Sequence, residues 1–195
     1  VIEMDERCIA IMEEIREKTG NCLKIVNGDA LKYNIADCPE TPKHIVSNLP
    51  YNISVPLLVG WLYDIKAFSS LTLMFQKEVA DRILAPVNCK DYGRISILAQ
   101  LQCNVERLLD HNPNYRHHKK HAPLPAPADS QLTKEQLAKI EKLTSLAFGQ
   151  RRKMIRQSLK SIPDLEAKCA QIGIQPSFRP EQITPRQFLA LANLI

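Results

Sequence analysis

Residues 44–58 read HIVSNLPYNISVPLL, and this stretch decides the fold. The run His44–Ser47 is typical of a β-strand, and it leads directly into the short loop Asn48-Leu49-Pro50-Tyr51. We expect Ser54 to cap the strongly apolar helix that follows. A strand, a loop and a helix in this order form one βα unit, the building block of a parallel sheet.

The alternation of strands and helices continues on both sides of this unit. In chain order, the further predicted segments are a strand end at Val1–Met4, a helix that begins after Asp5 and stops at Gly20, a strand at Leu23–Val26, a strand at Ser70–Phe75 and a helix at Lys77–Leu84. Strands separated by helices predict an α/β domain with a largely parallel sheet.

The second half of the chain has a different pattern. Residues 111–131 lack an apolar period and include a Pro- and Ala-rich run, which indicates an irregular connection. From Thr133 onward the pattern is helical: Leu137, Ile140, Leu143 and Leu146 are predicted to share one face of a helix ending at Gly149, basic residues fill the next helix, and Thr184-Pro185 caps a last one. The predicted division is therefore 1–110, 111–131 and 132–195, the last a small all-helical domain.

The basic residues of the second half are concentrated. The 195-residue chain has a net charge of +5, and no acid occurs between Leu143 and Pro163. Five cations fall in this interval: Arg151, Arg152, Lys153, Arg156 and Lys160. Such a stripe is the usual footprint of phosphate contact, and a solvated helix face is the alternative.

Several classes of protein are disfavoured by the composition. No run of about eighteen apolar residues occurs, so we predict no membrane span. The six cysteines form no CxxC pair, which favours free thiols in a reducing cytoplasm over a disulfide framework or a zinc site. His117, His118 and His121 are interpreted as part of a solvated basic loop, so we predict no metal site.

Polar residues follow three predicted strands at their C-terminal ends. Ligands of open α/β sheets bind at this edge. A carboxylate such as Glu3 can accept hydrogen bonds from both hydroxyls of a ribose. Asp29 can accept from an adenine amine, while the backbone N–H groups around Ala30 meet the ring nitrogens. The alternative for Asp29 is a purely structural role in the Asn27-Gly28-Asp29 turn.

The loop Asn48–Tyr51 suits methyl transfer to an aromatic amine, whose lone pair must be localised before it attacks. We expect the Asn48 side-chain oxygen and the Leu49 carbonyl to accept the two amine hydrogens. Pro50 fixes the backbone and adds no competing N–H. Tyr51 offers a ring on which a flipped base can stack, and Phe75 either covers the other face of that base or belongs to the core.

Seven segments in the same order resemble the small-subunit ribosomal RNA adenine dimethyltransferases, whose relatives include the erythromycin-resistance methylases and mitochondrial homologues. They are Val1–Asp5, Gly28–Ala30, Ser47–Ser54, Phe75–Val79, Tyr92–Ser96, Phe148–Arg156 and Arg179–Ile183. The combination is far more specific than any single motif, since DNA adenine methylases share only a short Asn-Pro-Pro-Tyr-type loop.

The resemblance implies a Rossmann-like methyltransferase domain, partial at residues 1–110, that uses S-adenosylmethionine. It implies dimethylation of two adjacent adenosines near the 3′ end of small-subunit ribosomal RNA, on the pre-30S subunit. We also predict that the protein is a monomer in the cytoplasm. By carry-over, the residues that bind the cofactor are Glu3, Asp29, Ala30 and Asn48, and the catalytic loop consists of Asn48, Leu49, Pro50 and Tyr51. Tyr51 and Phe75 hold the target base. The residues that bind RNA are Arg151, Arg152, Lys153 and Arg156.

Two departures from the family pattern leave a second hypothesis open. Family members begin with a Gly-rich strand–turn–helix that cradles the methionine end of the cofactor, whereas this sequence starts at the second strand. Residues 112–131 also replace a Pro-Lys-Pro-Lys-Val-type segment, as a divergent loop, a local frameshift or a decayed gene copy would. The alternative is therefore a catalytically inactive, truncated relative that acts only as a ribosomal RNA-binding assembly factor.

Overall fold

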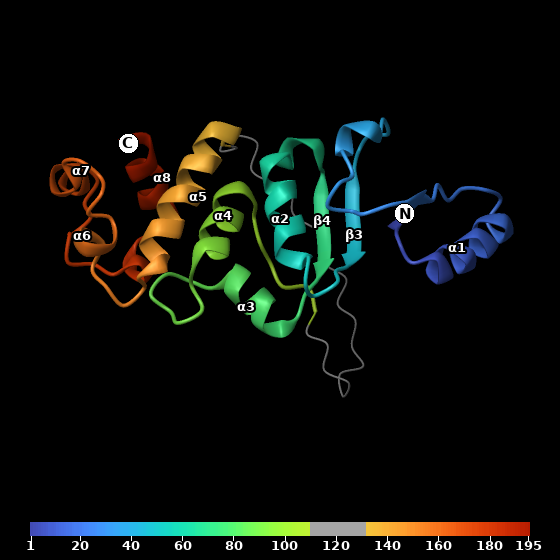
Figure 1. The fold of residues 1–195 in the computed structure, drawn as a ribbon, viewed down its shortest axis with the longest axis horizontal. Helices are drawn as coiled ribbons and strands as arrows, with labels where there is room; N and C mark the ends of the chain where they lie inside the picture. The colour runs from blue at the N-terminus through green and yellow to red at the C-terminus, as the bar shows by residue number, and fades with distance from the viewer. Residues whose placement is uncertain (110–131) are drawn as a thin grey trace. The chain divides into compact units, whose positions relative to one another are not determined.

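A computed structural model of the chain describes residues 1–109 and 132–195 (Figure 1). Backbone contacts divide it into two compact units, Val1–Thr41 and Pro42–Ile195, and each is described by itself. The described part of the chain contains no helix that is long and apolar enough to cross a membrane. The domain boundaries predicted at 110 and 131 fall outside the described residues and stay predictions.

The first unit contains one strand pair and one long helix. β1 (Ile2–Glu3) and β2 (Val26–Asn27) are parallel, with Glu3 opposite Asn27, and α1 (Glu6–Lys18) connects them. The Asp5 carboxylate caps α1 by accepting from the Arg7 N–H at 3.0 Å, as predicted. Gly20 ends the helix at a φ of +68°, a conformation that glycine adopts without strain. A 3₁₀ turn, η1 (Ile35–Asp37), follows β2.

The predicted strand at Leu23–Val26 was placed too early in the chain. The strand is Val26–Asn27, whose two residues pair with Ile2 and Glu3 of β1. The Lys24 carbonyl accepts instead from the N-terminal ammonium group of Val1 at 2.7 Å.

The second unit begins with a parallel pair joined by a crossover helix. β3 (His44–Asn48) pairs with β4 (Ser70–Met74), with Asn48 opposite Met74. α2 (Ser54–Tyr63) and the 3₁₀ turn η2 (Ile65–Ala67) connect the two strands, so the predicted βαβ unit is confirmed. Alternate strand residues point to opposite faces, so Leu71 and Leu73 pack on the core while Val46, on the other face, is 80% exposed.

The prediction that Ser54 caps α2 was wrong. The N-cap is Ile53, and Ser54 is the first helical residue. Its hydroxyl points back out of the helix and donates to the Tyr51 carbonyl at 3.2 Å. Pro56 falls in the first turn of the helix, where its missing N–H breaks no hydrogen bond.

Two helices follow β4. α3 (Lys77–Leu84) has its predicted bounds, but α4 (Arg94–Gln102) was not predicted. α4 is buried on nearly every side, so it lacks the polar face that identifies a surface helix in a sequence. The Ser96 hydroxyl accepts from the Gly93 N–H at 2.9 Å and donates to the Arg82 carbonyl, which joins the start of α4 to the end of α3.

The last part of the chain is helical, as predicted. Its elements are α5 (Lys134–Gly149), α6 (Ile155–Ser158), α7 (Leu165–Gln171), η3 (Pro180–Gln182) and α8 (Pro185–Asn193). Thr133 and Thr184 cap α5 and α8. Leu146, expected in the core, is 42% exposed because nine residues at 100° each place it opposite Leu137. The basic residues 151–153 form a turn and not part of a helix, since α6 begins at Ile155.

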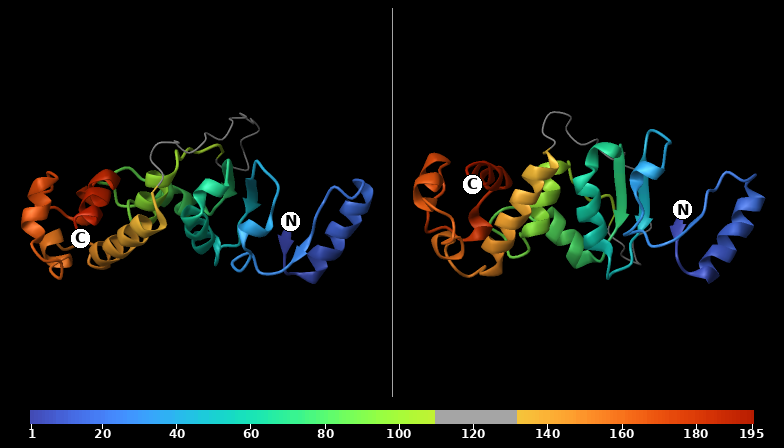
Figure 2. Two further views of the ribbon diagram at one scale, coloured as in Figure 1. Left: turned by 90° about the horizontal axis from the view of Figure 1, so that it is seen from above. Right: turned by 45° about the horizontal axis from the view of Figure 1, so that its top comes forward.

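One hydrophobic core includes residues from α2, α4, α5 and α8. Figures 1 and 2 show α4, α5 and α8 side by side in every view. The fully buried Tyr92 donates its hydroxyl to the Ile183 carbonyl at 2.8 Å. Gln102, also buried, donates to the Leu62 carbonyl at 2.9 Å and accepts from the Leu132 N–H at 3.0 Å. These two side chains therefore satisfy backbone groups that lie far apart in the sequence.

We expect Gln102→Leu to lower the free energy of unfolding of residues 42–195 by about 2–4 kcal/mol, because two buried backbone groups lose their partners. Urea unfolding followed by the fluorescence of Trp61, the single tryptophan, measures this change. Gln157→Leu, at an exposed position, is the control and should change stability by less than about 0.5 kcal/mol. Equal effects of the two substitutions would contradict the role of Gln102.

Candidate functional site

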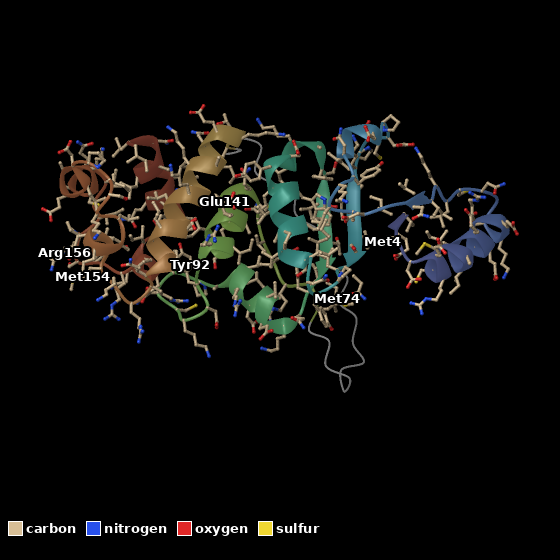
Figure 3. The ribbon with its side chains drawn as sticks, viewed as in Figure 1. Met4, Met74, Tyr92, Glu141, Met154 and Arg156 are labelled. Carbon is tan, nitrogen blue, oxygen red and sulfur yellow. The ribbon has the colours of Figure 1, made fainter. Side chains whose placement is uncertain are left out.

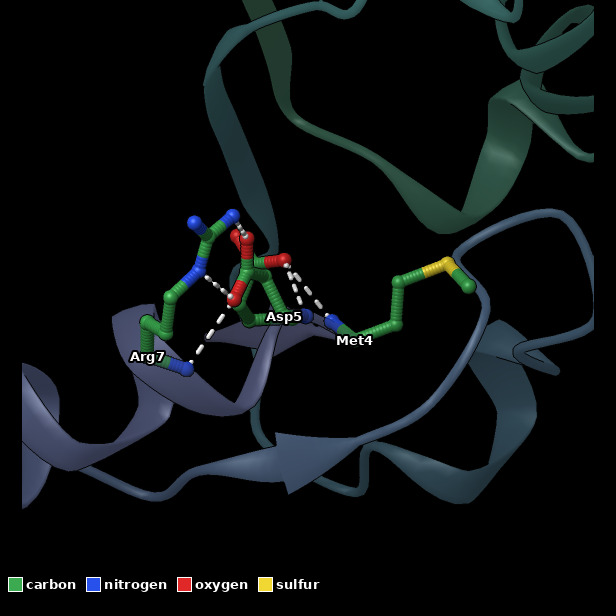
Figure 4. A network of polar contacts seen from close by, with 4 residues as sticks. Met4, Asp5 and Arg7 are labelled. Carbon is green, nitrogen blue, oxygen red and sulfur yellow. Dashed lines mark hydrogen bonds and ion pairs between the residues drawn. The ribbon is translucent and has the colours of Figure 1, made fainter.

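Glu3 lies at the C-terminal end of β1 with one carboxylate oxygen engaged. Its Oε1 accepts from the Met4 N–H at 2.8 Å and from the Asp5 N–H at 2.9 Å (Figure 4). Its Oε2 has no hydrogen-bond partner within the described residues, so that oxygen can accept from a ligand hydroxyl. The neighbouring Asp5 pairs with Arg7 at 2.7 Å, and this hydrogen-bonded guanidinium lowers the pKa of the Asp5 carboxyl.

Asp29 lies two residues beyond β2. The Gly28 N–H donates to the Glu3 carbonyl at 2.9 Å, which extends the ladder past Asn27 and brings the ends of both strands to one edge. Asp29 Oδ1 accepts from the Leu31 N–H at 2.9 Å, so this residue does shape the turn. Its Oδ2 and the Ala30 N–H have no partner among the described residues. One carboxylate oxygen at each strand end therefore remains available.

This pair of carboxylates fits a nucleoside. A ribose at Glu3 and an amine-bearing base at Asp29 would each meet an unoccupied acceptor oxygen, and the free Ala30 N–H supplies a donor for a ring nitrogen. The residues present are thus compatible with the adenosine part of the expected cofactor.

The loop Asn48–Tyr51 is held by hydrogen bonds at three points. The Leu49 N–H donates to the Met74 carbonyl at 3.3 Å, and the Leu49 side chain is buried. The Ile53 N–H donates to the Pro50 carbonyl at 3.2 Å, and the Ser54 hydroxyl donates to Tyr51. Within the described residues, the Asn48 side chain and the Leu49 carbonyl have no hydrogen-bond partner. The Asn48 side chain is exposed, whereas Leu49 is buried as a whole, so both acceptors lack a partner but only that of Asn48 lies on an exposed residue.

The two aromatic candidates differ in exposure. Tyr51 is 71% exposed, so its ring face is open to a partner. Phe75 is half-buried and packs against the core, which is the alternative that the sequence left open for it. Met74, labelled in Figure 3, ends β4 opposite Asn48 and is 52% exposed. The base-holding role of Phe75 remains a prediction.

The candidate residues belong to two units of the chain. Glu3, Asp29 and Ala30 lie in the first unit, and Asn48, Tyr51 and Phe75 lie in the second. The meeting of all these residues at one sheet edge remains a prediction. The histidines at 117, 118 and 121 and the divergent segment 112–131 lie outside the described residues.

The four basic candidates have different environments. Arg151 is half-buried: its Nη2 donates to the Cys89 carbonyl at 3.1 Å, and its guanidinium carbon lies 6.0 Å from the centre of the Phe148 ring. Arg152, Lys153 and Arg156 are exposed and form no ion pair with described residues; Figure 3 labels Arg156. Arg151 thus holds the turn in place, while the other three cations face solvent.

A contact that the sequence did not predict joins three helices. Tyr63 of α2 donates its hydroxyl to Glu141 Oε2 of α5 at 2.7 Å, and Arg94 of α4 lies 3.6 Å from Glu141 Oε1 (Figure 3 labels Glu141). Burial, together with the hydrogen bond to the Glu141 carboxylate, raises the pKa of Tyr63 to about 12. No local pattern signals this contact, because 78 residues separate Tyr63 from Glu141.

Parallel strand pairs and a crossover helix, with acceptor groups at the strand ends, are the architecture of a Rossmann-like domain, which is followed here by helices. Comparison with protein families makes the assignment specific. The family model described as ribosomal RNA adenine dimethylase matches residues 1–195, and the chain belongs to this family.

Individual relatives agree with the family match. The chain is 40% identical to ribosomal RNA small subunit methyltransferase A of Rhodospirillum rubrum, covering 100% of this chain and 69% of the relative. It is 41% identical to the protein of that name from Paramagnetospirillum magneticum, covering 100% of this chain and 70% of that relative. A dimethyladenosine transferase structure from Plasmodium falciparum has a TM-score of 0.69 at 25% identity, covering 97% of this chain and 78% of that one. The crystal structure of a 23S rRNA methyltransferase has the same fold, with a TM-score of 0.60 at 22% identity, covering 98% of this chain and 79% of that one.

We expect Arg151→Ala to lower the free energy of unfolding by about 1 kcal/mol, because the Cys89 carbonyl loses a charged donor and the Phe148 ring loses its cation. Arg152→Ala removes the same charge from a solvent-facing position and should change stability by less than about 0.5 kcal/mol. Urea unfolding monitored at Trp61 compares the two. The assignment fails if Arg152→Ala is as destabilising as Arg151→Ala.

Proposed function

We propose that this protein transfers methyl groups from S-adenosylmethionine to N6 of two adjacent adenosines near the 3′ end of small-subunit (16S) ribosomal RNA. The step belongs to ribosome biogenesis, and the substrate is a pre-30S subunit. The observation that carries the proposal is the pair of unoccupied acceptors, the Asn48 side chain and the Leu49 carbonyl, at the end of β3. Family membership and the names of the relatives support the choice of RNA.

The chemistry at the amine follows from these two acceptors. The lone pair of an adenine amine is delocalised into the ring and is a poor nucleophile. In the first transfer, hydrogen bonds from both amine hydrogens, to Asn48 and to Leu49, pull the nitrogen toward tetrahedral geometry and localise the lone pair. In the second transfer the singly methylated amine has one hydrogen, which one of these two acceptors would hold. After each N–C bond forms, the nitrogen loses one proton to solvent. The bound cofactor supplies an electrophilic methyl group on a sulfonium. No general base is obligatory, so positioning carries most of the rate increase.

The remaining candidates hold the two ligands. Glu3 Oε2 accepts from the cofactor ribose, Asp29 Oδ2 accepts from its adenine amine, and the Ala30 N–H donates to the adenine ring. Asn48 lies at the junction of the cofactor and the target amine. The exposed Tyr51 ring stacks on the flipped base, a contact worth about 1–3 kcal/mol, and Phe75 borders the opposite face.

The exposed cations hold the RNA. Arg152, Lys153 and Arg156 contact backbone phosphates, and the interaction depends on salt because each contact releases counterions. Arg151 contributes to this surface by shaping the turn that carries Arg152 and Lys153. We further propose that the protein acts in the cytoplasm as a monomer.

The test is transfer of labelled methyl from S-adenosylmethionine to under-methylated small ribosomal subunits. Recovery of label as dimethyladenosine in the small-subunit RNA is the expected result. Subunit binding without label would instead support an inactive assembly factor. Loss of both transfer and binding would overturn the proposed substrate.

We expect Asn48→Ala to reduce methyl transfer by at least about a hundredfold, because one of the two acceptors is removed, while the affinity for the RNA stays nearly unchanged. Single-turnover transfer and a filter-binding titration measure the two quantities. Asn52→Ala, an exposed asparagine four residues further on, is the matched control and should retain activity. If the Asn48→Ala variant retained methyl transfer, the Asn48 side chain would have no role in the mechanism.

We expect Arg152→Ala combined with Lys153→Ala to flatten the salt dependence of RNA binding. Removing two phosphate contacts lowers the slope of log affinity against log salt by about 1.5. Lys139→Ala combined with Lys142→Ala removes the same charge from α5 and serves as the control. An unchanged slope for the first pair, or an equal change for the control pair, would refute the phosphate contacts.

A further inference from the structure

Ser54 carries a buried hydroxyl in an otherwise apolar stretch. The residue is 3% exposed, and the other buried residues of α2 are Leu57, Leu58 and Leu62. Burying a hydroxyl is unfavourable unless it forms a hydrogen bond, and alanine is the better helix former. Its hydrogen bond to the Tyr51 carbonyl, at 3.2 Å, compensates for this burial. Core packing alone gives no reason for a serine here.

That hydrogen bond acts on the loop that carries the two acceptors. Three successive carbonyls lie between Asn48 and Asn52. The Pro50 carbonyl is occupied by the Ile53 N–H at 3.2 Å, and the Tyr51 carbonyl is occupied by the Ser54 hydroxyl. Only the Leu49 carbonyl has no partner among the described residues. The internal hydrogen bonds of the loop therefore leave one carbonyl free, the one that methyl transfer needs.

We propose that Ser54 is a positioning residue for methyl transfer: by holding the Tyr51 carbonyl, its hydroxyl fixes the loop so that Leu49 presents the acceptor for the target amine. This inference rests on the proposed function. Ser54 itself touches neither the base nor the cofactor, and it acts through the Pro50–Tyr51 backbone.

Loss of the hydroxyl has a defined consequence. The Tyr51 carbonyl, two residues from Leu49, is left without a donor and competes for hydrogens of the target amine. The backbone at Tyr51 also becomes free to rotate, which moves the ring that stacks on the base. The phosphate-contacting cations that dock the RNA lie elsewhere in the chain and are unchanged, and the base is flipped onto Tyr51 only after the RNA has docked. We therefore expect kcat to fall while KM for the RNA stays nearly constant.

The experiment compares Ser54→Ala, Ser54→Thr and Thr144→Val in the full chain, by methyl transfer to under-methylated small subunits. Thr144 is the matched control: it is fully buried, and its hydroxyl donates to the Glu141 carbonyl three residues earlier at 3.1 Å. We expect Ser54→Ala to lower kcat about tenfold without raising KM. Ser54→Thr keeps the hydroxyl and should restore the rate, and Thr144→Val should lose stability without losing kcat.

The outcomes separate this inference from the proposed function. If the unsubstituted protein transfers no methyl, the proposed function fails and the role of Ser54 fails with it. If the unsubstituted protein is active and Ser54→Ala is equally fast, or Thr144→Val is equally slow, only the positioning role is overturned. Ser54→Cys fills the same space with a weak donor and decides the matter if Ser54→Ala does not fold: an unchanged kcat would refute the role.

Discussion

The second unit depends on the parallel pairing of β3 with β4, carried one residue past the strands by the hydrogen bond from the Leu49 N–H to the Met74 carbonyl. This bond ends the ladder at a defined residue. Because the Leu49 side chain is buried at the same point, the chain must turn there, and the backbone of Pro50 and Tyr51 is brought to the surface. The acceptors of the candidate site are a consequence of where the strand stops.

The helices that follow are organised around a buried element, α4. The Ser96 hydroxyl hydrogen-bonds the start of α4 to the end of α3, and Gln102 hydrogen-bonds its end to Leu62 and Leu132. Tyr92, two residues before α4, donates its hydroxyl to the Ile183 carbonyl. The family motif Tyr92–Ser96 therefore has a structural role in the described residues. The helix that follows the candidate catalytic loop, α2, and the helices on either side of the basic turn, α5 and α6, contribute residues to one core.

The candidate site was only partly predictable, and particular residues show why. Asp29 was expected either to bind a ligand or to shape a turn; its Oδ1 shapes the turn, and its Oδ2 has no partner among the described residues. Arg151 was grouped with three other cations because they are adjacent in the sequence, yet it alone is held by a carbonyl 62 residues away. Ser54 is a residue type that commonly caps helices, but its hydroxyl donates to the carbonyl of Tyr51, three residues earlier.

The sequence by itself determined the family, the βαβ unit and the caps of α1 and α8, because each motif, strand, helix and cap is recognised from residues within a few positions of one another. Short-range patterns of this kind can be recognised in the sequence without knowledge of the fold. Only the tertiary structure decided which polar groups are occupied and which are free. The Tyr51 carbonyl is occupied by the hydroxyl of Ser54, three residues further on, and the Leu49 N–H is occupied by the Met74 carbonyl of β4. Spacing in the chain encodes neither the direction in which a serine hydroxyl turns nor the strand that lies beside the loop.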